Sequence, residues 1–102
     1  MAARARQCVE WGVHSIYLHY GADQRNADGS QDGVQWLDEV LATVRVPVGV
    51  GTFGVDDAVR AVAKGAELVA IGHPIIGSSK AAAELREFVR EVRANYRPRP
   101  RA

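Results

Sequence analysis

The sequence of 102 residues has a single cysteine, Cys8, and no apolar run long enough to cross a bilayer. One cysteine excludes an internal disulfide and is typical of a reducing compartment. The longest apolar stretches fall far short of the roughly 20 residues that a membrane span needs. The first residues also lack the apolar segment of a secretory signal. These absences predict a soluble, cytoplasmic protein with no membrane partner.

The sequence also has no marked excess of positive or negative charge, because the formal net charge is only +1 at pH 7. A nearly balanced charge gives no electrostatic basis for binding nucleic acid, so we expect no nucleic-acid partner. The sequence has no G-x-x-x-x-G-K-[ST] phosphate loop, no convincing order of serine, histidine and aspartate, and no metal-ligand spacing. With 47% hydrophobic residues, it still has enough apolar side chains for one small globular domain.

The most informative stretch covers residues 46–54, Val-Pro-Val-Gly-Val-Gly-Thr-Phe-Gly. Its valines suit a strand that is buried on both faces, and its glycines let the backbone turn tightly or approach a ligand. Asp56 or Asp57 can cap the helix that follows. Ligands bind at the carboxyl ends of the strands in parallel sheets, so we interpret residues 51–54 as one edge of a ligand-binding site.

The rest of the chain alternates helical and extended patterns. We predict helices over residues 2–11, 34–44 and 56–64, and strands over residues 13–19, 46–50 and 67–71. A last helix starts at Ser78 or Ser79 and carries an apolar stripe as far as Tyr96. Gly12 and Gly65 each end a helix, and the segments around them form a faint internal repeat of helix end, glycine and buried strand. This order of elements requires parallel strands with right-handed crossovers.

A TIM barrel spends about 250 residues on eight units, or about 31 on each. The chain therefore holds about three parallel βα units after a spare helix, and we predict the α/β class as a partial TIM (β/α)₈ barrel. Three strands leave two open sheet edges, so we expect a homo-oligomer or a missing N-terminal half-barrel as partner. The uncapped opening helix gives no support to Met1 as the native start. Residues 1–96 form the barrel domain, and residues 97–102 form a basic Pro/Arg tail that we expect to be frayed and solvated.

Each predicted strand ends on residues that can carry chemistry. These are His19 and Asp23 after the first strand, Gly51 and Thr52 after the second, and Gly72 and His73 after the third. In a parallel sheet all three ends lie on one rim, where free N–H groups and helix N-termini favour an anion such as phosphate. His19 can donate a proton near neutral pH. On the pattern alone, His19 is as often a structural residue, and Asp23 as often a turn residue.

Three segments resemble the 3-hexulose-6-phosphate synthases of the orotidine 5′-monophosphate decarboxylase superfamily. Residues 5–13, followed by residues 18–23, resemble the sixth strand of that family with its His-x-Gly-x-Asp. Residues 46–53 resemble the seventh strand, which normally ends Ala-Gly-Gly, and residues 65–76 resemble the eighth. The likeness covers about residues 3–92 in the right order and spacing. These enzymes are TIM barrels that work as dimers on sugar phosphates.

The resemblance implies part of an aldehyde-lyase that joins formaldehyde to ribulose 5-phosphate through a Mg²⁺-stabilised enediolate. It implies that His19 handles a proton on the enediolate and that Asp23 lies in the loop that follows. The implied phosphate cradle consists of Gly51, Thr52, Phe53, Gly72 and His73.

The sequence departs from the family in two respects. Thr52 and Phe53 stand where the family has Gly-Gly, and the Asp-x-Lys-x-x-Asp segment is absent, together with the acidic ligands of Mg²⁺. We therefore expect the chain to be inactive by itself. Two alternatives stay open. One is a sugar-phosphate decarboxylase of the same superfamily, acting on orotidine 5′-phosphate or 3-keto-gulonate 6-phosphate. The other is a non-catalytic remnant that binds phosphate or scaffolds an oligomer.

Overall fold

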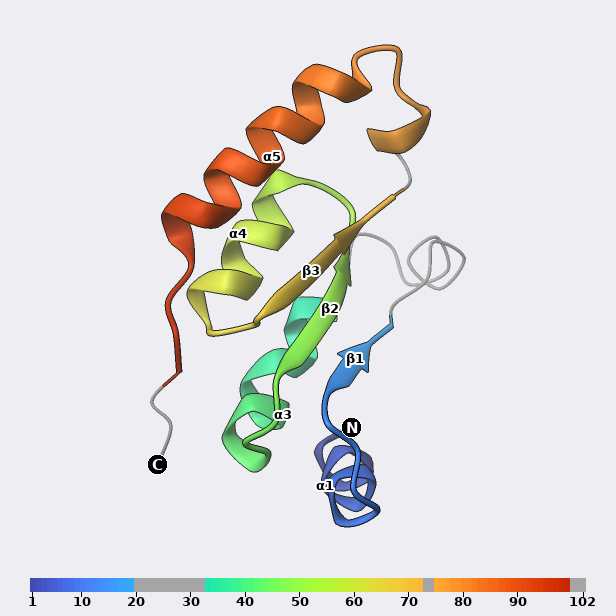
Figure 1. Cartoon of the computed structure of the whole chain (residues 1–102), viewed down its shortest axis with the longest axis vertical. Helices are drawn as coiled ribbons and strands as arrows, with labels where there is room; N and C mark the ends of the chain where they lie inside the picture. The colour runs from blue at the N-terminus through green and yellow to red at the C-terminus, as the bar shows by residue number, and fades with distance from the viewer. Residues whose placement is uncertain (20–32, 73–74, 100–102) are drawn as a thin grey trace.

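Three parallel strands form the sheet in the computed structural model, which describes residues 1–19, 33–72 and 75–99 (Figure 1). The strands are β1 (Ile16–Leu18), β2 (Val48–Thr52) and β3 (Leu68–Ile71), with β2 in the centre. Leu18 pairs with Val50, and Thr52 pairs with Ile71. All three strands end at the same edge of the sheet, which we call the rim (Figure 1).

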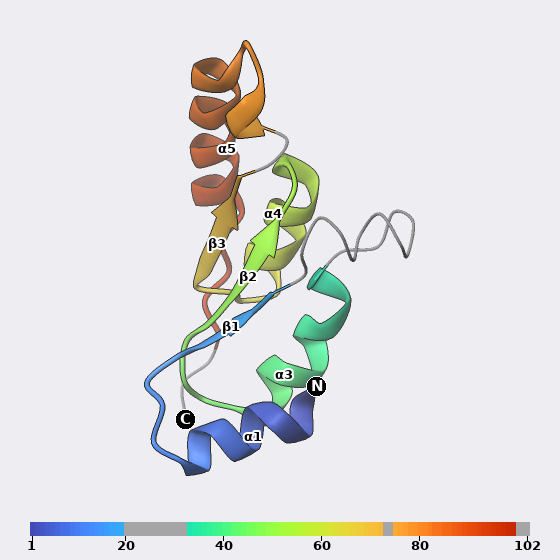
Figure 2. The same cartoon turned by 90° about the vertical axis from the view of Figure 1, so that its right-hand side faces the viewer.

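Helices cover one face of this sheet. The helical elements are α1 (Ala2–Glu10), η1 (Gly33–Trp36), α3 (Leu37–Thr43), α4 (Val55–Ala63), η2 (Ile75–Gly77) and α5 (Ala81–Asn95). Helices α3 and α4 lie on the same side of the sheet (Figure 2), α1 packs against α3, and α5 lies along α4. The opposite face, which carries Tyr17 and Leu68, is open, and these side chains are 46% and 59% exposed.

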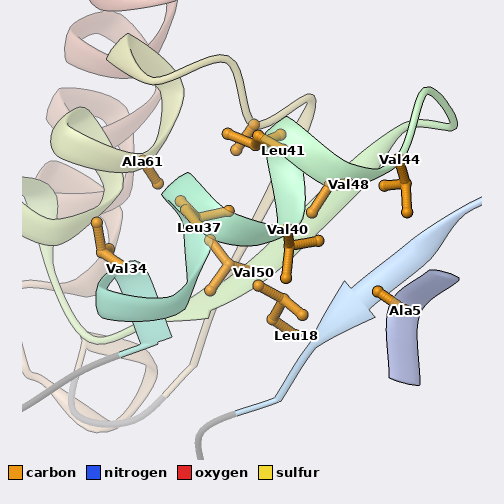
Figure 3. Packing of buried hydrophobic residues seen from close by; sticks show 11 residues of the cluster. Ala5, Leu18, Val34, Leu37, Val40, Leu41, Val44, Val48, Val50 and Ala61 are labelled. Atoms are coloured by element: carbon orange, nitrogen blue, oxygen red, sulfur yellow. The ribbon is translucent and has the colours of Figure 1, made fainter. Parts of the chain in front are cut away.

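The core lies between β2 and the helices (Figure 3). Val48 and Val50 are fully buried there, against Leu37 and Val40 of α3. Burial of each such side chain is worth about 1.5–3 kcal/mol. Since side chains alternate along a strand, the residues of β2 that face the open side are glycines, at positions 49 and 51.

The structure confirms the α/β class and the three parallel strands of a partial TIM barrel, and it corrects several boundaries. β1 begins at Ile16, because only there does the backbone reach the neighbouring strand, with the Ile16 N–H donating to the Pro47 carbonyl. β2 is shifted two positions along the chain and continues through Thr52, because the pairing with β3 continues that far. The helix predicted over residues 34–44 is divided into η1 and α3.

Two glycines end helices as predicted. Gly12 follows α1 with φ of 94°, and Gly65 follows α4 with φ of 110°. A side chain strains the backbone in this left-handed region, so glycine is the residue that ends a helix in this way at low cost. The two halves of the internal repeat therefore share a real backbone feature.

The C-terminal tail contradicts the expectation of a frayed, solvated segment. The Arg97 N–H donates to the Val62 carbonyl at 2.9 Å. The Arg99 guanidinium donates to the carbonyl oxygens of Leu41, Val44 and Val46 at 3.1, 2.8 and 2.7 Å. An arginine in sequence carries no sign of carbonyl partners that lie more than 50 positions away, and so composition suggested solvation. The tail runs back to the amino end of the sheet, opposite the rim (Figure 1).

None of the helices in the described parts of the chain combines the length and apolarity that a membrane span requires.

Candidate functional site

His19 lies at the rim directly after β1, and its side chain is exposed. Its imidazole is 6.4 Å from the Tyr17 ring, centroid to centroid, and the two planes are inclined by 32°. Residues two apart on a strand share a face, so β1 brings both rings to the open side of the sheet. Tyr17 did not figure among the predicted site residues, although the Tyr-x-His spacing on a strand was the signal that could have found it.

Gly51 lies next to Tyr17 at the end of β2. A β-carbon on Gly51 would lie 2.7 Å from the Tyr17 hydroxyl oxygen, so the phenol occupies the space that a side chain would need. Glycine at this position thus lets a side chain of β1 lie across β2. The backbone of Gly51 is part of the rim, as the sequence predicted, but it belongs to the strand rather than to a loop.

Thr52 turns its side chain to the helix-covered face, where it is buried. Its hydroxyl donates to the Ala70 carbonyl of β3 at 2.9 Å. That hydrogen bond ties the ends of β2 and β3 together. It also commits the Thr52 hydroxyl to the protein itself, so a ligand at the rim meets the backbone of Thr52.

Asp57 shapes the loop between β2 and α4. Its Oδ2 accepts the Phe53 N–H at 2.7 Å, and its Oδ1 accepts the Gly54 N–H at 2.9 Å. The carboxylate is in the first turn of α4, where the helix dipole stabilises a negative charge. Of the two aspartates predicted as caps, Asp57 is buried and Asp56 is exposed. The N–H groups of Phe53 and Gly54 are thus occupied, and an anion at this loop has to use other donors.

Gly72 follows β3 at the same rim, and the space where its β-carbon would lie is open. Because the strands are parallel, the structure therefore brings His19, Gly51 and Gly72 to one edge of the sheet. Asp23 and His73, the other predicted site residues, lie outside the described residues.

Described residues of α5 form a hollow of about 890 Å³, which is lined by Leu85, Val89 and Arg90 among others. This hollow lies along the outer surface of α5 and does not reach the strand ends. It is therefore separate from the predicted site at the rim.

A Mg²⁺ ion does not fit the described residues. Among residues 1–19, 33–72 and 75–99, no three histidine, cysteine, aspartate or glutamate side chains lie close enough to hold a metal ion. Asp57, the carboxylate nearest the rim loop, is engaged by two backbone N–H groups. We therefore assign no step to a metal held by these residues.

The parallel strands, the helices on one face and the strand ends at one rim define part of a TIM-barrel fold. A crystal structure of 3-hexulose-6-phosphate synthase from Salmonella typhimurium matches this chain with a TM-score of 0.82 and 22% sequence identity. The match covers 93% of this chain and 45% of the synthase, so the chain spans less than half of that enzyme's length. It fits a C-terminal portion of the barrel, as the resemblance in sequence predicted. No protein-family model and no curated protein matches the sequence.

Proposed function

We propose that the chain supplies the phosphate-binding rim and the proton-handling histidine of a sugar-phosphate lyase similar to 3-hexulose-6-phosphate synthase. The observation that carries the proposal is the convergence of three strand ends, bearing His19, Gly51 and Gly72, on one rim. The fold likeness to the synthase, over 93% of the chain, supports it.

The proposed reaction starts with loss of a proton from ribulose 5-phosphate, which leaves an enediolate. The enediolate carbon then forms a bond to the carbon of formaldehyde, and the formaldehyde oxygen takes up a proton. The product is a hexulose 6-phosphate, and nothing is oxidised or reduced. His19 is exposed at the rim, and histidine is the side chain that most often serves as a general acid or base.

The phosphate is proposed to bind backbone N–H groups at the ends of β2 and β3. Strand ends that lack bulky side chains let an anion approach the main chain, whereas the dipole at the N-terminus of α4 already stabilises the Asp57 carboxylate. The predicted contacts of Gly51, Thr52, Phe53, Gly72 and His73 stay a prediction. At Thr52 and Phe53 fewer donors are free to bind phosphate, since the Thr52 hydroxyl and the Phe53 N–H already bond to the protein.

The remaining groups are proposed to come from further βα units. The edge strands β1 and β3 each pair with one described strand only, and the open face of the sheet exposes Tyr17 and Leu68. Five more units, on the same polypeptide or on a partner, would close the barrel. They would also supply the Asp-x-Lys-x-x-Asp segment and the carboxylates that hold Mg²⁺ in the cytoplasmic, dimeric enzyme that the resemblance implies.

One observation favours the non-catalytic alternative. Two polar groups of the predicted phosphate cradle, the Thr52 hydroxyl and the Phe53 N–H, bond to the protein itself. A cradle with fewer free donors binds phosphate less tightly, as in a remnant that scaffolds an oligomer.

The test is an assay of the protein at its native length, isolated from its source cell. Formation of hexulose 6-phosphate from ribulose 5-phosphate and formaldehyde, dependent on Mg²⁺, is the expected result. Release of CO₂ from 3-keto-L-gulonate 6-phosphate or orotidine 5′-phosphate, without that product, would assign the decarboxylase instead. Absence of both activities would favour the non-catalytic remnant that binds phosphate or scaffolds an oligomer.

A further inference from the structure

The side chain of Tyr17 leans toward the rim. In the parallel register, Tyr17 pairs with Gly49, yet its hydroxyl lies over Gly51, two positions nearer the carboxyl end of β2. The phenol therefore reaches from the middle of the sheet to the edge where His19 lies. Its ring and the His19 imidazole are neighbours, with centroids 6.4 Å apart.

The glycines of β2 make this arrangement possible. A β-carbon on Gly51 would be 2.7 Å from the Tyr17 hydroxyl oxygen but 3.7 Å from the ring carbon that bears it. The first distance is a collision and the second an ordinary contact. The hydroxyl group of Tyr17, and not its ring, therefore requires a glycine at position 51.

The Tyr17 hydroxyl makes no hydrogen bond to any residue in the described ranges, and the side chain is 46% exposed. Neither does the His19 imidazole bond to a described residue, and it too is exposed. A phenol both donates and accepts a hydrogen bond and is neutral at pH 7. It can therefore pair with a sugar hydroxyl as donor or as acceptor, whereas the charged oxygens of a phosphate only accept and are proposed to bind the backbone N–H groups of the rim.

We propose that Tyr17 is a specificity-determining residue, whose hydroxyl binds a hydroxyl of a phosphorylated ketose beside His19. This rests on the proposed function, because the phosphate end of the same substrate is taken to lie at the rim. Tyr17 then discriminates a sugar phosphate from inorganic phosphate. Gly51 is a positioning residue that leaves room for the phenol.

The experiment measures dissociation constants of ribulose 5-phosphate and of inorganic phosphate for the protein at its native length. Tyr17→Phe keeps the ring and removes the oxygen, so the preference for ribulose 5-phosphate over phosphate should fall by about 2- to 10-fold, the worth of one hydrogen bond. Affinity for inorganic phosphate should not change. Tyr96→Phe, at the far end of α5 from the rim, is the matched control and should leave both constants unchanged.

Gly51→Ala gives an independent check through a double-mutant cycle. In the wild-type background the new methyl group displaces the Tyr17 hydroxyl, so the preference should fall as it does in Tyr17→Phe. In the Tyr17→Phe background the methyl group fits, and the preference should not fall further.

An unchanged preference in Tyr17→Phe, with both ligands still bound, would overturn the role of Tyr17 and leave the proposed function intact. An equal loss of both affinities would also overturn it, since Tyr17 would then act on the fold. Failure of the wild type to bind either ligand would overturn the phosphate rim itself, and the inference with it.

Discussion

The guanidinium of Arg99 donates a hydrogen bond to the Val46 carbonyl at 2.7 Å, although 53 positions separate the two residues. Val46 lies just before β2, so the end of the described chain is fastened to the start of the central strand. The Glu67 carboxylate, just before β3, lies 3.5 Å from the same guanidinium, whose side chain is only 12% exposed. Arg99 thus joins the connections that lead into β2 and β3.

Arg99→Met should lower the free energy of unfolding by about 2–3 kcal/mol, because hydrogen bonds from a charged, mostly buried donor are lost. Methionine retains much of the apolar stem, so packing changes little. Urea denaturation measures the effect. Arg97→Met is the control, since the Arg97 side chain is exposed and bonds to the adjacent Tyr96 carbonyl. Equal losses in the two variants would contradict a specific role for Arg99.

Gly65→Ala should be more destabilising than Gly12→Ala. Both glycines have positive φ, so both variants incur the left-handed penalty of about 1–2 kcal/mol. A β-carbon on Gly65 would in addition collide with Cγ of Arg99, whereas one on Gly12 meets no atom within 4 Å. In an Arg99→Ala background, the cost of Gly65→Ala should fall to that of Gly12→Ala. A cost that is independent of residue 99 would show that the collision is relieved in another way.

Asp57→Ala should lower the free energy of unfolding by about 1–2 kcal/mol, because the N–H groups of Phe53 and Gly54 lose their acceptor. Thermal or urea unfolding measures this. Asp56→Ala is the matched control, as its side chain is adjacent but exposed, and a change within about 0.5 kcal/mol is expected. The assignment of the cap would be wrong if Asp56→Ala were the costlier change.

If the proposed function holds, His19→Ala should reduce kcat for hexulose 6-phosphate formation by about 10²- to 10⁴-fold, the usual worth of a placed proton carrier. His14→Ala offers a close control, because His14 is also exposed and lies before β1, at the end of the sheet away from the rim. Its kcat should equal that of the wild type. Steady-state formation of hexulose 6-phosphate measures both, and an unchanged rate in His19→Ala would remove this residue from the mechanism.

The isolated chain should self-associate, because apolar side chains on the open face of the sheet gain by leaving water. Leu68→Lys puts a charge on that face, where Leu68 is 59% exposed, and should shift the equilibrium toward monomer. Val89→Lys does the same on the outer surface of α5, where Val89 is 46% exposed. Sedimentation equilibrium compares the two. A larger effect of Val89→Lys would move the contact to α5, and a monomeric wild type at high concentration would contradict the open-barrel interpretation.

The features that local chemistry dictates were predictable from the sequence. Buried valines at positions 48 and 50 marked the central strand, and Gly12 and Gly65 marked helix ends that the structure confirms. The likeness to the synthase, carried by short motifs at the strand ends, agreed with the fold found by structural comparison.

Features that depend on distant partners were not predictable. Arg99 reads as a solvated residue because its carbonyl acceptors, such as Val44, belong to another element. The sequence alone leaves the Thr52 hydroxyl available to a ligand, because its acceptor, the Ala70 carbonyl, lies on another strand, β3. The Tyr-x-His spacing places Tyr17 on the same face as His19, but the position of the Tyr17 hydroxyl above Gly51 appears only with the pairing of β1 and β2.

The two glycines of β2 also determine which positions of the sheet set the properties of its open face. Gly49 and Gly51 give the open face no side chains of their own, and Leu68 and Tyr17 from the flanking strands lie across them. The central strand therefore contributes its buried valines to the core, while the side chains on the opposite face come from the neighbouring strands. Substitutions on β1 or β3 can therefore change the chemistry of this face without altering the strand that holds the sheet together.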